Sequence, residues 1–246
     1  MDSQYFREYY TLERNHWWFT ARSLILKDQI SKIASGRKLK ILNVGIATGS
    51  TTEMLSEFGE VTSVEYDKDC CDFLRMELQM EVTEASVTAL PYNDESFDLV
   101  CAFDVIEHVE EDQLAIHELK RVCKKESHVF CTVPAFRFLW SKHDEVNHHI
   151  RRYTASQFGK LFHENGKIIF GSYFNTLLFL PVTVFRLISK ILPSGFMRKG
   201  AGSDFTITGG NSFSPLLFKL LSSERYWLNK ARSLPFGISY LLLWKK

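Results

Sequence analysis

The chain has 246 residues, of which 45% are hydrophobic, so it can form one compact α/β domain with additions and a large core. Its 30 Lys and Arg residues against 29 Asp and Glu residues argue against nucleic acid as the main partner. The five cysteines lack CxxC spacing, which excludes a zinc site of that type and argues against a disulfide framework. No signal-peptide pattern opens the chain, and the apolar stretch 176–192 is interrupted by Pro181, Arg186 and Lys190. We therefore expect a cytoplasmic protein.

Helix and strand patterns alternate through the middle of the chain. Residues 1–36 are expected to be helical and carry many aromatic side chains. Apolar runs predict strands at 39–44, 60–65, 82–85, 97–103, 128–133, 167–174 and 236–244. Helices are expected at 51–58, 68–80, 111–124, 154–164, 176–192 and 213–231. This alternation predicts an α/β fold with a doubly wound, mostly parallel sheet and right-handed crossovers.

A tight turn follows the first predicted strand, in the segment ILNVGIATGSTTEML. Gly45, Ala47 and Gly49 are small residues that let a backbone approach a ligand closely. Their spacing differs from the G-x-G-x-x-G dinucleotide fingerprint, which disfavours a nicotinamide oxidoreductase. Glu65 ends the second predicted strand, where a carboxylate can accept both ribose hydroxyls of a nucleoside. A simple turn and a solvated acid are the alternative interpretations.

These motifs resemble those of the class I S-adenosylmethionine-dependent methyltransferases. VTSVEYDKD and ALPYNDESFDLVCAFDVIEHV are similar to the second strand and the LPF…SFDLV…VIEH region of that family, and the likeness covers residues 38–135. The chain also resembles a bacterial subgroup with HWWFxxR, H.RRYT, YFN and PFG.S motifs. The resemblance implies a Rossmann-like sheet of seven strands whose last strand is antiparallel. It implies a helical arm or lid at 1–36, a cofactor-binding domain at 37–174, a helical insertion at 175–232 and the last strand at 233–246.

The resemblance implies S-adenosyl-L-methionine as the cofactor. The positions that match the family's cofactor-binding residues are Asn43, Gly45, Ala47, Gly49, Glu65, Tyr66, Ser86, Val87, Phe103 and Asp104. The loop would line the amino-acid part, Glu65 the ribose, and the tip of the fourth strand the methionine. Asn43, Ala47 and Ser86 depart from the acid, the glycine and the aspartate usual in the family. These departures leave open a catalytically silent relative that binds the cofactor and has a regulatory role.

Candidate catalytic residues follow the fourth and fifth strands. Transfer from a sulfonium methyl group requires an aligned acceptor, and a hydroxyl acceptor also requires a base. We expect His149 or His108 to be that base, with Arg151 or Arg152 binding an anionic group and Tyr153 in the same site. For His108 the alternative is a packed histidine beside a helix-capping acid. For the segment WSKHDEVNHHIRRYT the alternatives are a solvated loop, an ion-pair latch or a divalent-metal site. No ligand spacing enforces a metal there, so none is expected.

The segments that flank the central strands have several interpretations. The aromatic N-terminus is either a packing arm or a lid that places Trp17, Trp18 and Arg22 near the acceptor. The apolar segment FNTLLFLPVTVFRLISKILPSGFMRK either completes an acceptor pocket, forms a dimer surface or contacts a membrane interface. The third interpretation depends on the basic residues Arg186, Lys190, Arg198 and Lys199.

The sequence therefore predicts an enzyme that methylates an oxygen of a small, lipid-linked or glycan-linked acceptor by in-line transfer. We expect it in the cytoplasm, alternatively at the periphery of the membrane, as a monomer or homodimer. No nucleic-acid partner is expected, because the chain shows no basic aromatic stripe.

Overall fold

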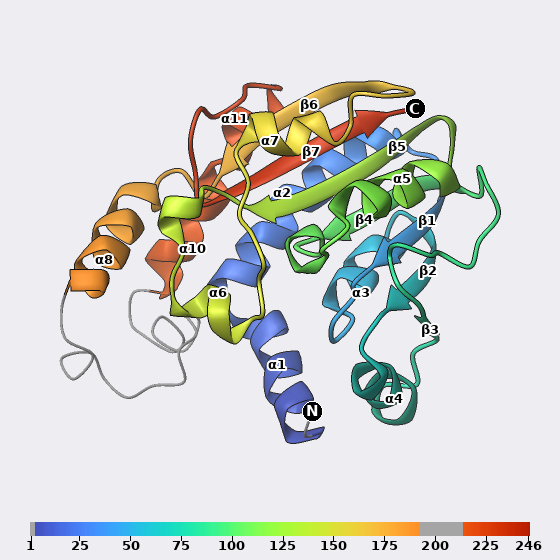
Figure 1. Cartoon of the computed structure of the whole chain (residues 1–246), viewed down its shortest axis with the longest axis horizontal. Coiled ribbons are helices and arrows are strands. Elements are labelled where there is room, and N and C mark those ends of the chain that lie inside the picture. Colours follow the sequence, from blue (N-terminus) through green and yellow to red (C-terminus); the bar gives the residue numbers. More distant parts are fainter. Residues whose placement is uncertain (1–2, 192–213) are drawn as a thin grey trace.

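The structure is a computed structural model that describes residues 3–191 and 214–246 (Figure 1). Its centre is one sheet with the strand order β3-β2-β1-β4-β5-β7-β6. The strands are β1 (Leu39–Val44), β2 (Gly59–Glu65), β3 (Thr83–Glu84), β4 (Phe97–Phe103), β5 (Cys123–Pro134), β6 (Lys167–Phe174) and β7 (Ser239–Lys245). β7 lies antiparallel between β5 and β6, while the other pairings are parallel. The predicted seven-stranded, mostly parallel sheet with an antiparallel last strand is confirmed.

Helices cover both faces of this sheet (Figure 1). On one face lie α2 (Trp17–Ala34), α3 (Ser50–Ser56), α10 (Ser214–Ser223) and α11 (Arg225–Asn229). The other face is covered by α5 (Asp112–Val122) and α7 (Ala155–Lys160). A hydrophobic core lies on each face. Within β1, Ile41 belongs to the core under α2 and Leu42 to the core under α5, because successive side chains of a strand point to opposite faces. Burial on both faces explains the nearly continuous apolar runs of the strands.

The strand order reverses between β1 and β4. The chain leaves β1 towards β2 and β3, and later returns to β1's other side with β4. In open α/β sheets, ligands bind beyond the carboxyl ends of the strands at such a switch point. The loop that begins at Gly45 and the residue Asp104 follow β1 and β4 directly, so both lie at this edge. Because β7 is antiparallel, its first residue, Ser239, lies there too, paired with Pro134.

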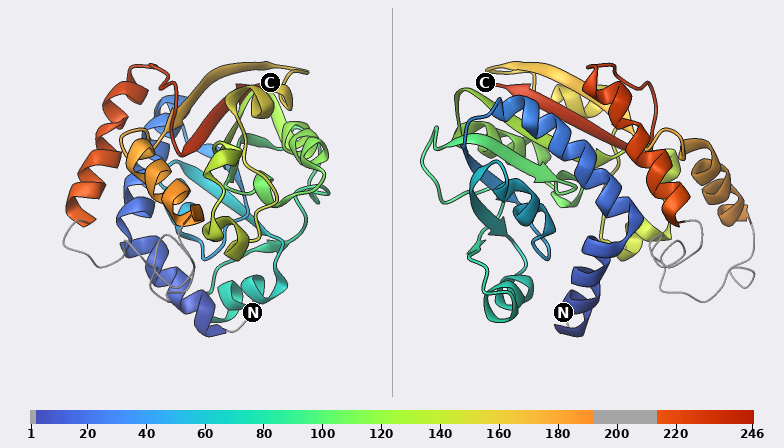
Figure 2. Two further views of the ribbon diagram at one scale, coloured as in Figure 1. Left: turned by 60° about the vertical axis from the view of Figure 1, so that its left-hand side comes forward. Right: turned by 180° about the vertical axis from the view of Figure 1, so that it is seen from behind.

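The N-terminal segment forms two helices instead of one. α1 (Ser3–Asn15) ends before His16, whose ring nitrogen Nδ1 accepts a hydrogen bond of 3.2 Å from the backbone N–H of Trp18. A side-chain acceptor at this position satisfies an otherwise unpaired donor at a helix start. α2 then runs along the sheet beside α10, while α1 continues past the sheet edge (Figure 2). The break is therefore encoded by His16 itself.

Other elements differ from the sequence expectation in their ends. β5 begins at Cys123 rather than at 128, because Cys123 already pairs with Phe97 of β4. β7 begins at Ser239 rather than at 236. The helix expected at 213–231 is divided into α10 and α11 at Glu224. Three short helices were not expected: η1 (Ile106–His108), η2 (Arg137–Leu139) and α6 (Lys142–Val146). The remaining helices are α4 (Lys68–Glu77) and α8 (Phe179–Ile191).

The insertion docks on the N-terminal arm through Asp28 of α2. Its carboxylate accepts hydrogen bonds of 2.6 Å from Nε and Nη2 of Arg225 and of 2.6 Å from Nδ2 of Asn229. Burial alone would raise the pKa of Asp28, but these hydrogen bonds outweigh burial and lower it. Asp28 therefore holds α11 against α2 as a carboxylate.

We expect Asp28→Asn to lower the melting temperature at pH 7, because the variant loses the charge that Arg225 binds. A partly exposed bidentate pair contributes about 1 kcal/mol, or roughly 2–4 °C for a chain of this size. Since the folded-state pKa is lowered, this contribution is present above the unfolded pKa of about 3.9 and is lost as pH falls through the folded value. Thermal unfolding of wild type and variant should therefore converge below about pH 4.

The matched control is Asp72→Asn, which removes an acid from the exposed pairs with Lys68 and Arg75 on α4. This control should change the melting temperature little. An equal shift in both variants would contradict the role given to Asp28.

Candidate functional site

The turn after β1 has a backbone conformation that favours small residues. Gly45, Ala47 and Gly49 have φ angles of 69°, 48° and 87°. A Cβ on Gly45 would lie 2.4 Å from a methyl carbon of Val105, so a larger residue would not fit. Ala47 adopts the left-handed region although it has a Cβ, which costs strain of a kind that concentrates at functional sites. A ligand can therefore approach the backbone of this turn closely, as a bound cofactor would require.

The carboxylate of Glu65 is fixed by three backbone N–H groups. Oε2 accepts from Ala47 at 3.0 Å, and Oε1 accepts from Tyr66 at 2.8 Å and from Asp67 at 3.1 Å. A carboxylate offers about four lone-pair sites, so acceptor capacity remains for a ribose hydroxyl. These residues fit the nucleoside part of S-adenosylmethionine.

The residues predicted near the adenine lie next to Glu65. The backbone N–H of Ala85 donates to the Glu65 carbonyl at 3.0 Å, which brings Ser86 and Val87 to this strand end. Val87 is buried and Tyr66 is 76% exposed. The structure thus gathers Glu65, Tyr66, Ser86 and Val87 in one place.

Asn43 is buried behind the loop. Its Nδ2 donates to the hydroxyl oxygens of Thr51 at 2.9 Å and Thr52 at 3.0 Å, which fixes the first turn of α3. Its Oδ1 is buried without a hydrogen-bond partner among the described residues. An unpaired buried acceptor favours a ligand with a donor group, and the cofactor's ammonium is such a donor. The amide therefore fits the cofactor, although it lacks the charge of the usual acid.

α1 lies across the turn after β1, residues 45–49, which is called the cofactor loop below because it matches the family's cofactor-binding positions. Nη2 of Arg14 donates to the Thr48 carbonyl at 3.2 Å and to Glu53 of α3 at 2.5 Å. The Thr48 hydroxyl donates to Glu13, and Phe6 stacks on Phe73 of α4 with ring centroids 5.6 Å apart. The arm therefore covers the loop as well as packing on the sheet.

Asp104 joins the arm to two strands. Nη2 of the buried Arg22 donates to Oδ2 of Asp104 at 2.6 Å and to the Thr132 hydroxyl oxygen at 3.0 Å. That hydroxyl in turn donates to Oδ1 of Asp104 at 3.0 Å. Asp104 has a φ of 57°, so its backbone is also strained at the tip of β4. Phe103, directly before it, is buried against Phe130.

A cavity of about 410 Å³ opens beside Asp104 at the same sheet edge. Its apolar lining comes from the arm and from the insertion: Trp17, Trp18, Phe19, Leu178, Pro181, Val182, Phe185, Leu217 and Ile238. The polar part of its lining includes Glu107, His108, His143, His149 and Arg152. Predominantly apolar walls with a few convergent polar groups are typical of small-molecule sites.

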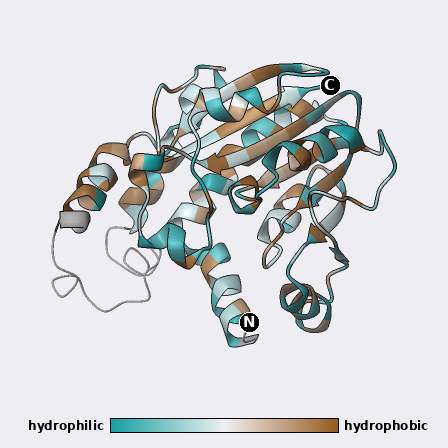
Figure 3. Ribbon diagram, in the orientation of Figure 1, coloured by the Kyte–Doolittle hydropathy of each residue, from teal (hydrophilic) through white to brown (hydrophobic). Residues whose placement is uncertain are grey.

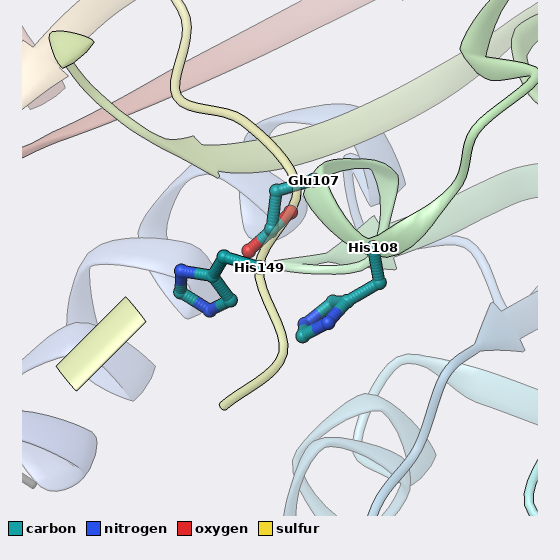
Figure 4. A group of neighbouring side chains, drawn as sticks. All are labelled: Glu107, His108 and His149. Carbon is teal, nitrogen blue, oxygen red and sulfur yellow. The ribbon is translucent and has the colours of Figure 1, made fainter. Parts of the chain in front are cut away.

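Three side chains form a polar cluster in this cavity. Glu107 and His108 belong to η1, and His149 follows α6 (Figure 4). One carboxylate oxygen and one nitrogen of each ring all lie within 4.8 Å of one another. Burial and the negative charge of Asp104 raise the pKa of Glu107 well above its usual value. Burial and then the nearby His149 lower the pKa of His108 to about 4, so His108 is neutral at pH 7.

Asp144 orients His149 from behind. Its Oδ1 is 2.8 Å from Nδ1 of His149 and accepts from Nε of Arg152 at 2.7 Å. The backbone N–H of Ser141 donates to Oδ2 at 2.8 Å. Burial would raise the pKa of Asp144, but the His149 hydrogen bond and the Arg152 charge hold it far below its usual range. An ionised Asp144 requires the proton of His149 to be on Nδ1.

The structure brings only some of the expected catalytic residues to the cavity. His108, His149 and Arg152 line it, but the Arg152 guanidinium already binds Asp144 and the Ala135 carbonyl. Tyr153 is buried in the core, and its hydroxyl donates to Asp112 at 2.8 Å, so it does not reach the cavity. Arg151 donates to the same carboxylate at 2.8 Å. Both arginines therefore have carboxylate partners within the chain.

Sequence reasoning did not select several important residues. Asp144 was noted within the segment WSKHDEVNHHIRRYT but was not selected as a site residue, although an acid among histidines and arginines was an available signal. Glu224 is buried and accepts backbone N–H groups from Asn175, Thr176 and Leu177, and no local pattern indicates this. Arg186, one of the basic residues on which the membrane interpretation depended, is buried and donates to the Leu139 carbonyl at 2.6 Å. The side chain of Lys190 and residues Arg198 and Lys199 lie outside the described residues.

Comparisons with known proteins agree with this geometry. Residues 42–131 match the family described as "Methyltransferase domain". An uncharacterized methyltransferase of Schizosaccharomyces pombe is 31% identical over 107 residues, 37% of this chain and 38% of that protein. A phosphatidylethanolamine N-methyltransferase of Cereibacter sphaeroides is 26% identical over 97 residues, 37% of this chain and 48% of that protein. The matched part thus spans less than half of either relative.

Among solved structures, a SAM-dependent methyltransferase from Archaeoglobus fulgidus has the same fold. It superposes with a TM-score of 0.58 at 14% identity, over 98% of this chain and 100% of that chain. Residues 42–131 thus match a methyltransferase domain, and the described chain shares the fold of that solved methyltransferase.

Proposed function

We propose that the chain is an S-adenosylmethionine-dependent methyltransferase that methylates an oxygen of a small, largely apolar acceptor. The observation that carries this proposal is the position of the cavity, which opens beside Asp104 at the switch point of the sheet. The cofactor loop and Glu65 lie at the same edge. A cofactor held there would have its methionine end towards the acceptor cavity.

The chain's own residues supply what the reaction requires. The bound cofactor supplies an electrophilic methyl group, so the protein must align the acceptor, exclude water and accept a proton from a hydroxyl. Trp17, Trp18 and the insertion form an apolar wall that excludes water. The Glu107, His108 and His149 cluster is the polar part of the lining where an acceptor hydroxyl would be bound and deprotonated.

The insertion supports a lipid-like acceptor and contact with a membrane surface. α8 lines the cavity with Val182 and exposes Leu180 and Ile188, which are 69% and 49% accessible. Much of α8 is hydrophobic in Figure 3. An exposed apolar helix face beside an apolar cavity suits an acceptor taken from an interface. One relative is named for phosphatidylethanolamine methylation, which agrees with this class of acceptor. Within residues 3–191 and 214–246, no helix has the length and apolar character needed to cross a membrane.

Glu65→Ala is expected to weaken cofactor binding. It removes a charged acceptor from the ribose hydroxyls, a loss of about 1.5–3 kcal/mol, or roughly 10- to 100-fold in affinity. Calorimetry with S-adenosylmethionine measures this directly. The exposed Glu60→Gln, on the same strand, is the control and should bind like wild type. If wild type binds the cofactor but transfers no methyl group to any extract fraction, the chain is a silent relative instead.

Val182→Trp is expected to block the acceptor cavity without affecting the cofactor. The larger ring would occupy space in the cavity wall, so labelled methyl transfer to a lipid extract should fall by about tenfold or more, which corresponds to about 1.4 kcal/mol. Met76→Trp, at an exposed position on α4, serves as the control. Equal transfer by both variants would place the acceptor elsewhere.

The double variant Leu180→Asp and Ile188→Asp is expected to lose binding to anionic phospholipid vesicles, because both charges would enter the apolar face of α8. Co-sedimentation of wild type and variant measures the difference. Met76→Asp, at an exposed position on α4, should sediment like wild type. Wild type that stays in the supernatant would remove the membrane contact.

A further inference from the structure

The polar cluster of the cavity has the composition of a metal site. It combines one carboxylate and two imidazoles, from Glu107, His108 and His149, on two segments that are far apart in the sequence (Figure 4). One potential ligand atom from each residue lies within 4.8 Å of the other two. His108 and His149 are close neighbours, with ring centroids 4.8 Å apart and planes at 80°. Three donor atoms therefore face one small volume.

Glu107 gives an independent reason for a cation. Its side chain is completely buried, and neither carboxylate oxygen has a hydrogen-bond partner among the described residues. A buried carboxyl without partners is costly, and such groups in native proteins are normally paired or bound to a metal. The nearby Asp104 does not need this cation, because Arg22 and Thr132 already bind its two oxygens.

His149 is held as metal-binding histidines usually are. His149 has Nδ1 against the Asp144 carboxylate at 2.8 Å, which leaves Nε2 with a free lone pair. Asp144 is itself fixed by Arg152. His108 lies beside His149 in the lining of the same cavity. A ring N–H donated to a carboxylate or a backbone carbonyl is the usual second contact of a histidine ligand.

We propose that Glu107, His108 and His149 bind one divalent transition-metal ion such as Mn²⁺, Fe²⁺, Co²⁺ or Zn²⁺. Two imidazoles and one carboxylate favour these ions over Mg²⁺ and Ca²⁺, which prefer oxygen ligands. Bonds of about 2.0–2.2 Å require the three donor atoms to move closer than their present separation, by small side-chain rotations. The sequence did not predict this site because its ligands come from two segments without a shared spacing.

The site has a consequence for the acceptor, and that consequence alone rests on the proposed function. All three ligands line the acceptor cavity, so the remaining coordination positions face it. A metal there would bind a hydroxyl or carboxylate oxygen of the acceptor and lower the pKa of a hydroxyl. Because the metal would occupy the histidine lone pairs, the hydroxyl proton would then pass to solvent and not to a histidine.

The test is a titration of the chelator-treated full chain with Co²⁺ in the absence of cofactor. We expect one Co²⁺ per chain by calorimetry, with visible absorption bands that report nitrogen and oxygen coordination. A hundredfold excess of Mg²⁺ should not displace it. Glu107→Gln, His108→Asn and His149→Asn should each weaken Co²⁺ binding by about tenfold or more. Glu145→Gln and His163→Asn, which change exposed residues of the same types, should bind like wild type.

Thermal unfolding separates metal binding from loss of the fold. In chelator, Glu107→Gln should melt no lower than wild type, because it removes a buried carboxyl without partners. Co²⁺ should raise the melting temperature of wild type but not of this variant. Absence of binding tighter than about 1 mM in folded wild type would overturn the proposal. So would equal binding by wild type and Glu107→Gln, or displacement by Mg²⁺. Cofactor binding without metal binding would refute the metal site alone, and the reverse would refute the proposed function alone.

Discussion

The contact between Arg22 and Asp104 determines how the remaining parts of the site are arranged. Arg22 comes from the N-terminal arm, yet its guanidinium binds the tip of β4 and the Thr132 hydroxyl of β5. A buried guanidinium is stable only with such partners, so α2 has one position on the sheet. That position sets Trp17 and Trp18 along one side of the cavity. It also satisfies Asp104, which leaves Glu107 as the carboxyl without a hydrogen-bond partner in the described part of this edge.

Asp144, Glu224 and Glu107 are buried acids at the carboxyl edge of the sheet. They have different partners, and the partners determine what each acid can do. Asp144 is an ion held by Arg152, and it serves to orient His149. Glu224 has a raised pKa through burial, although three backbone N–H groups oppose the rise, and it fixes the chain between β6 and α8. Glu107 has neither kind of partner, and it is the acid that lies among the histidines.

The sequence predicted the features that depend on local patterns. β1 has the expected bounds, and Glu65 lies at the end of β2 as expected. Both predictions follow from apolar runs that are bounded by glycine or charged residues. The start of β5 was missed because residues 124–127 are polar, and the strand begins at Cys123 through its pairing with Phe97 of β4. The break at His16 depends on one ring nitrogen. The arm with Trp17 and Trp18 and the insertion were each given as possible parts of an acceptor site, and both line the cavity. The shape of the cavity could not be predicted, since its walls are far apart in the sequence. Tyr153, expected in the same site, instead contacts Asp112 from the core, because adjacent residues of a chain can face opposite ways.

The insertion docks on α2 outside the part of the chain that matches the methyltransferase family model. The matched methyltransferase domain ends at residue 131, whereas the apolar wall of the cavity comes from 17–19 and from 178–238. α2, which carries Trp17 and Trp18, and the insertion contact each other through Asp28 and Arg225. The apolar wall and the stretch that matches the methyltransferase family model are therefore carried by separate parts of the chain, so a substitution in the wall reshapes the cavity and leaves the matched stretch unchanged.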